Sequence, residues 1–213
     1  AVTFSQIIYI LIMLGVTLTA AGFTYLSPIK DTRQSHKVIN YFAGFFFFTC
    51  FAFTSFLIRP FINDSISILF TNILFLTNLY LLQHGLMWRK GIEIDFYKNR
   101  PALCHIFLFV SSQLMIHRFT QDFSFWLTIN LAFNSIWVLA TMLFLIKLDR
   151  HNQNTAGETA LLRIIPMVML TFVLTPIFYV FSPSYFHFQS LIMLFQIISI
   201  VATIMGLQSL LLG

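Results

Sequence analysis

Long apolar stretches, separated by charged or proline-containing segments, follow one another along the whole chain. A helix needs about 20 mostly apolar residues to cross the hydrocarbon core of a bilayer. The pattern predicts seven such helices, at 4–26, 38–58, 66–88, 102–117, 124–146, 162–181 and 187–210. The expected fold is therefore an all-α membrane protein, a seven-helix bundle in which residues 1–213 form one transmembrane domain.

The composition strengthens this assignment and excludes a water-soluble enzyme. Hydrophobic residues make up 58% of the chain and charged residues only 9%, whereas soluble proteins carry about 25% charged residues. A soluble domain of this size could not bury so much apolar surface in one core. The two cysteines, Cys50 and Cys104, fall in apolar runs and are expected to be buried, inert thiols.

The fourth predicted helix is the weakest of the seven. It is short, and it contains His105, Gln113 and His117. An alternative therefore stays open, in which the fourth segment is re-entrant and the chain crosses the membrane six times.

Basic residues are distributed very unevenly among the predicted loops. The first, third and fifth loops hold ten lysines and arginines, whereas the second and fourth hold only Arg59 and Arg118. Basic loops stay on the cytoplasmic side of a membrane. We therefore expect the N-terminus outside and the C-terminus in the cytoplasm. The chain starts without Met and stops directly after an apolar run, so we also expect a longer protein to continue beyond Gly213.

Polar residues recur at helical spacing on three of the predicted helices. They are Asn130, Asn134, Trp137 and Thr141 on the fifth, Thr77, Asn78, Tyr80 and His84 on the third, and Gln189, Gln196 and Thr203 on the seventh. Polar groups in hydrocarbon need partners inside the bundle, so these faces are predicted to point inward.

Two interpretations of these polar faces stay open. They either form hydrogen bonds that hold helices together, or they anchor a ligand in an uncharged, mostly apolar pocket. Such a pocket would suit a small, neutral, lipophilic ligand. The candidate ligand contacts are Asn130, Asn134, Trp137, Tyr80, His84 and Gln196.

Two histidines are predicted to lie at equal depth on adjacent helices. His84 lies five residues before Arg89, and His105 lies five residues after Arg100. Paired histidines of this kind could be axial ligands of a haem. Hydrogen bonding to neighbouring helices is the interpretation that we favour, because no repeat or supporting carboxylate accompanies the pair. We therefore expect neither a cofactor nor a metal.

Several classes of membrane protein lack their necessary residues here. No Asp, Glu, Lys or Arg lies near the middle of any predicted helix, although ion-coupled transporters usually need one. The last predicted helix contains no lysine, which excludes a retinal Schiff base. We also find no nucleophile with its base and no phosphate-binding glycine pattern, so we expect no enzymatic activity from this chain.

The third predicted helix carries a resemblance to a known group. Its sequence, ILFTNILFLTNLYLLQHGLMWRKG, is an Asn-containing apolar run that ends in Tyr, Gly and basic residues. With the seven helices and short loops, it resembles the N-terminal membrane sensor regions of bacterial signalling proteins. In those proteins the sensor region is linked to a cytoplasmic diguanylate cyclase or histidine kinase. The resemblance implies a bacterial inner membrane location and a role in signal transduction.

Three functions remain open from the sequence. The first is a sensor or receptor module that binds a ligand and signals to a cytoplasmic output domain. The second is a small-molecule transporter, and the third is a redox or accessory subunit of a membrane complex. We expect membrane lipids and a small lipophilic ligand as partners, allow for a homodimer, and expect no nucleic acid.

Overall fold

The computed structural model describes residues 4–26, 36–58, 61–62, 64–120, 123–147 and 156–181. These residues form helices and short connections, without any strand. The helices are α1 (Phe4–Leu26), α2 (His36–Ile58), α3 (Asp64–Arg89), the short 3₁₀ helix η2 (Phe96–Lys98), α4 (Arg100–Phe119), α5 (Phe123–Lys147) and α6 (Ala156–Phe181). Each of the first six predicted spans lies in one of these α-helices. The seventh span, with Gln189, Gln196 and Thr203, lies outside the described residues.

Five of these helices are long and apolar enough to cross a membrane. Their apolar stretches are His36–Ser55, Ile66–Arg89, Arg100–Phe119, Phe125–Lys147 and Gly157–Ile177. The apolar stretch of α1, Ile10–Leu26, is shorter. The protein is therefore a multi-pass helical membrane protein. The fourth predicted segment is one continuous helix of 20 residues, and it is one of these five.

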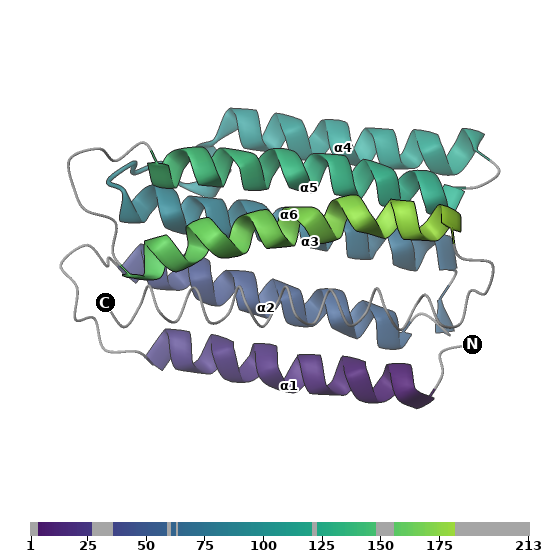
Figure 1. Ribbon diagram of the computed structural model, residues 1–213, viewed down its shortest axis with the longest axis horizontal. Coiled ribbons are helices and arrows are strands. Elements are labelled where there is room, and N and C mark those ends of the chain that lie inside the picture. The colour runs from purple at the N-terminus through teal and green to yellow at the C-terminus, as the bar shows by residue number, and fades with distance from the viewer. Residues whose placement is uncertain are drawn as a thin grey trace.

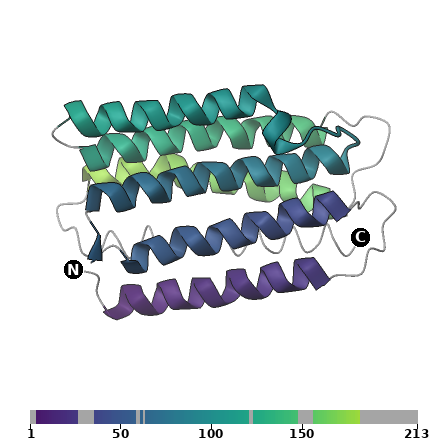
Figure 2. The ribbon, with the colours of Figure 1, turned by 180° about the vertical axis from the view of Figure 1, so that it is seen from behind.

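The helices lie side by side and alternate in direction along the bundle (Figures 1 and 2). α3 is central, because it packs against α2, α4 and α5, while α1 packs on α2 and α6 packs on α5. At one end of the bundle α3 ends at Arg89 and α4 begins at Arg100. The first turn of α2, with Lys37, lies at the same end. We call this the basic end; it is on the left in Figure 1.

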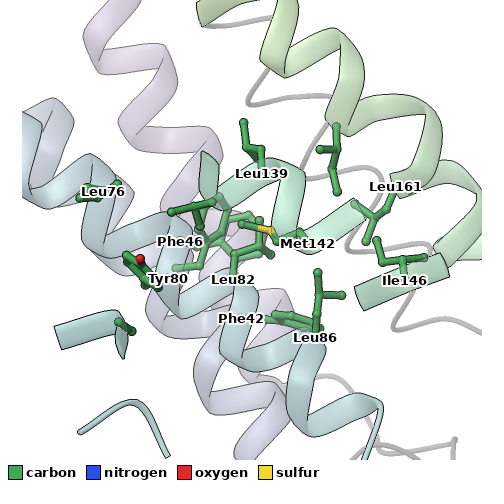
Figure 3. Packing of buried hydrophobic residues seen from close by; sticks show 14 of the residues in the cluster. Phe42, Phe46, Leu76, Tyr80, Leu82, Leu86, Leu139, Met142, Ile146 and Leu161 are labelled. Atoms are coloured by element: carbon green, nitrogen blue, oxygen red, sulfur yellow. The ribbon is translucent and has the colours of Figure 1, made fainter. Parts of the chain in front are cut away.

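The apolar core lies where α2, α3, α5 and α6 meet (Figure 3). It contains Phe42, Phe46, Leu76, Tyr80, Leu82, Leu86, Leu139, Met142, Ile146 and Leu161, all buried. Lipid tails are as apolar as these side chains, so close packing contributes more to helix association here than removal of apolar surface from water.

Local sequence determines the sharp connection between α3 and α4. Gly91 has a φ of 77°, a conformation that glycine adopts without strain. It allows Gly91 to donate to the Trp88 carbonyl at 3.1 Å and Ile92 to donate to the Met87 carbonyl at 2.9 Å. These two bonds end α3 in a Schellman motif.

The two cysteines have different environments. Cys50 is buried in α2, where its sulfur lies 2.9 Å from the hydroxyl oxygen of Thr17 in α1. Cys104 is exposed on α4. The expectation of a buried thiol is therefore wrong for Cys104, because an apolar sequence does not distinguish a helix face that packs on protein from one that faces outward.

Gly85 of α3 lies against a buried phenylalanine ring of α2, where a larger residue does not fit. A Cβ atom at position 85 would overlap a ring carbon of Phe42. We predict that Gly85→Ala lowers the free energy of unfolding by about 1–3 kcal/mol, because the buried ring has to move. Thermal unfolding in detergent would measure this change.

Gly44→Ala is the matched control, since a Cβ there would meet Leu81 at an ordinary 3.7 Å. Equal melting temperatures for the two variants would contradict the predicted close contact.

Candidate functional site

Polar side chains of α3 form hydrogen bonds with three neighbouring helices. Asn78 lies 2.8 Å from the hydroxyl of Thr49 in α2. Gln83 donates to the hydroxyl of Thr141 in α5 at 2.7 Å. Because α3 is central and surrounded by helices, its polar groups are satisfied by protein rather than by water.

A longer set of hydrogen bonds leads from Tyr80 on α3 through α4 to α5. The Tyr80 hydroxyl bonds Nδ1 of His105, and Nε2 of His105 lies 2.7 Å from Oδ1 of Asn134. An amide oxygen can only accept, so Nε2 carries the proton. With a neutral imidazole, Nδ1 then accepts from the Tyr80 hydroxyl. His105 thus joins all three helices.

The same set continues deeper into the bundle between α5 and α4. The Asn134 amide donates to the side-chain oxygen of Asn130. Asn130 donates to the Ser112 hydroxyl at 2.7 Å, and Ser112 donates to the Phe109 carbonyl at 2.7 Å. Each donor in this set thus points away from Tyr80 and toward the Phe109 carbonyl. We call Tyr80, His105, Asn134, Asn130 and Ser112 the Tyr80 network.

His84 binds the backbone of the same tyrosine from the other side. Its ring is fully buried, and Nδ1 lies 2.7 Å from the Tyr80 carbonyl, which can only accept. Nε2 is therefore unprotonated and accepts from the Asn99 amide at 3.0 Å. Asn99 in turn accepts from the backbone N–H of Ala102 at 3.3 Å and caps α4.

This geometry bears on the haem hypothesis for His84 and His105. Each of the four imidazole nitrogens has a hydrogen-bond partner within the protein. Coordination of iron would require at least one of these bonds to break on each ring. Among the described residues, no group of three or more His, Cys, Asp or Glu side chains is placed to hold a metal ion.

The segment between α3 and α4, residues 90–99, folds onto α2 at the basic end. Lys37 forms an ion pair with Asp95 at 2.8 Å and lies 4.2 Å from the ring centre of Trp88. The hydrogen bond from Lys37 lowers the pKa of Asp95. The backbone N–H of Phe96 donates to the Tyr41 hydroxyl at 2.8 Å. We call residues 90–99 the α3–α4 loop.

A buried ion pair connects the same end of α3 with α6. Glu158, in the first turn of α6, is 1% exposed. Its carboxylate lies 3.1 Å from Nζ of Lys90 and 3.5 Å from Nε of Arg89. Removing one partner of such a pair costs more than the pair contributes, because the other charge stays buried.

The structure brings together only some of the predicted ligand contacts. Asn130, Asn134 and Tyr80 belong to the Tyr80 network, and His84 adjoins it through the Tyr80 carbonyl. Trp137 does not join them, since its side chain is 61% exposed. The expectation that it points inward is wrong, because an indole ring, unlike an amide, needs few polar partners in lipid. Gln196 lies outside the described residues.

Sequence reasoning missed several residues of this region. It assigned no role to the loop residues Asp95 and Asn99, although they bond Lys37 and His84. One signal was available for Asn99, because an Asn directly before an Arg-Pro pair is typical of a helix start. No local signal identifies Asp95 as a partner of Lys37, because 58 residues separate the two.

Comparisons with known proteins give no family for this chain: no family model matches it, and neither does any curated protein or solved structure.

The Tyr80 network predicts energetic coupling between helices. We expect Tyr80→Phe and Asn134→Leu each to lower the free energy of unfolding by about 0.5–1 kcal/mol, as interhelical hydrogen bonds usually do. The double variant should lose less than the sum, since both partners bond the same imidazole. Unfolding in detergent would measure the coupling.

Asn72→Leu is the matched control, because Asn72 bonds Gln113 in a separate pair at 3.2 Å. Its effect should add to that of Tyr80→Phe. Additive effects of Tyr80→Phe and Asn134→Leu would contradict coupling through His105.

Proposed function

We propose that this protein is a membrane-embedded sensor module that binds a small, neutral, lipophilic ligand among its helices. In this proposal it lies in a bacterial inner membrane, with the basic end in the cytoplasm, and signals there to an output domain. The Lys and Arg distribution supports this orientation, and the resemblance of the third helix to sensor regions agrees with it.

One observation carries the proposal, namely the continuity of hydrogen bonds from the interior to the basic end. The Tyr80 network leads from Ser112 to Tyr80. The Tyr80 carbonyl then connects it, through His84, with Asn99 at the end of the α3–α4 loop. A ligand that replaces one of these hydrogen bonds would change the hydrogen bonding of the residues connected to it. It would thereby bias the position of the α3–α4 loop.

The chemistry of the network supports a neutral ligand. Its members are hydroxyls, amides and one imidazole, so it contains no carboxylate, lysine or arginine to attract an ion. Asn130 and Asn134 are only half-buried, and an amide can both donate and accept. A hydroxyl or carbonyl group of a ligand can therefore replace the hydrogen bond between these two residues.

The other two candidate functions have weaker support. Ion-coupled transporters use ionisable groups within the membrane, whereas the ion pairs of Lys37, Arg89 and Lys90 lie at the basic end. A haem-binding redox subunit would need histidine nitrogens that here have protein partners.

A ligand-binding site at Asn134 has a direct consequence for thermal stability. We predict that a panel of neutral amphiphiles (quinones, long-chain alcohols and aromatic esters) contains compounds that raise the melting temperature of the detergent-solubilised protein. A ligand at 100 times its Kd adds about 2.7 kcal/mol to the free energy of unfolding. Asn134→Leu should remove this shift, because Leu neither donates nor accepts.

Asn40→Leu is the control, since Asn40 is exposed on α2, away from the network, and it should keep the shift. A panel without any stabilising compound, or a shift that survives Asn134→Leu, would contradict the proposed site.

A further inference from the structure

One side-chain amide connects the start of α4 with a buried histidine. Asn99 donates from Nδ2 to Nε2 of His84 at 3.0 Å, and its Oδ1 accepts from the backbone N–H of Ala102 at 3.3 Å. His84 can accept this bond only while Nε2 carries no proton. The N-cap of α4 and the neutral state of His84 therefore depend on the same side chain.

A proton on His84 would be incompatible with this arrangement. It would place the Nε2–H of His84 against the NH₂ group of Asn99, two donors at hydrogen-bond distance. Rotating the Asn99 amide would restore that bond but would turn its NH₂ group toward the N–H of Ala102, so α4 would lose its cap. The second nitrogen of His84 offers no alternative, because it already donates to the Tyr80 carbonyl at 2.7 Å.

We propose that His84 and Asn99 form a proton-sensitive joint, in which protonation of His84 releases the start of α4 and opens the α3–α4 loop. The neutral imidazole keeps the loop closed, with the ring of Phe96 packed edge-on against it at 5.3 Å between centroids. This device does not depend on the proposed ligand, so either proposal can fail without the other.

The neighbours of His84 come from each element packed around it. α2 contributes Tyr41, whose ring centroid lies 5.8 Å away, and α4 contributes its N-cap, Asn99. The loop contributes Asp95, whose charge attracts an imidazolium but is already paired with Lys37. The group that faces Nε2 is thus the Nδ2 donor of Asn99, and no carboxylate of the described residues bonds the ring.

The direction of the pH effect depends on whether the closed or the open loop allows His84 to take up a proton. The closed loop requires neutral His84, whereas an open loop exposes an imidazole with an ordinary pKa of about 6.5. Closure is therefore complete above about pH 6.5. Below it, the open fraction should rise by about tenfold per pH unit, since one proton is taken up on opening.

Hydrogen–deuterium exchange of the full chain in detergent, between about pH 5 and 8, tests this joint. After correction for the intrinsic pH dependence of exchange, protection at the amides of Phe96 and Ala102 should fall about tenfold per unit below about pH 6.5. Asn99→Asp should reverse the trend. A carboxylate caps α4 equally well, and it accepts from a protonated His84, so protection should rise as the pH falls.

Asp95→Asn is the control for the other ionisable group of the loop. It should keep the pH dependence of the unmodified chain, because the pKa of Asp95 is lowered by Lys37 and its carboxylate stays ionised in this range. Constant protection between pH 5 and 8, loss of the pH dependence in Asp95→Asn, or the same trend in Asn99→Asp as in the unmodified chain would each overturn the proposal.

Discussion

A polar side chain in hydrocarbon has no water to bond, and this constraint decides how α3 contacts its neighbours. Asn78 bonds α2, Gln83 bonds α5, and the Tyr80 hydroxyl bonds His105 on α4. Each bond contributes only about 0.6 kcal/mol on average between membrane helices. Their directions matter more than their strength, because each fixes which face of α3 meets which helix.

Tyr80 has a special position among these contacts because it is bonded at two points. Its hydroxyl bonds Nδ1 of His105 and its carbonyl accepts from His84. The two imidazoles consequently carry their protons on different nitrogens, Nδ1 in His84 and Nε2 in His105. Hydrogen bonding in the bundle interior and the capping of α4 by Asn99 thereby depend on one residue of the central helix.

The sequence was sufficient to predict the helices but only part of the site. Apolar length predicted the positions of six α-helices, five of which are long and apolar enough to cross a membrane. Counting residues from Arg89 and Arg100 predicted equal depth for His84 and His105, and both rings bond Tyr80. It failed for Trp137, which shares the ideal helical face of Asn134 but is exposed. Helical spacing gives the direction of a Cα–Cβ bond, whereas the need for a polar partner decides which of those side chains turns inward.

Contacts of the α3–α4 loop could not be predicted for a different reason. The ion pair between Lys37 and Asp95 joins residues that are far apart in sequence, and neither lies in a periodic pattern. The end of α3 at Gly91 and the start of α4 at Asn99 follow from local capping rules. Where the loop between them lies depends on α2, and therefore on tertiary packing.

The most direct test of this account is the protonation pattern of the two histidines, read by NMR of the protein labelled with ¹⁵N-histidine at about pH 8. Signals would be assigned with single substitutions of His84 and His105. The account predicts opposite neutral tautomers, with the proton on Nδ1 in His84 and on Nε2 in His105. Finding the same tautomer in both rings, or a charged ring in either, would contradict the two hydrogen bonds that Tyr80 forms with these histidines.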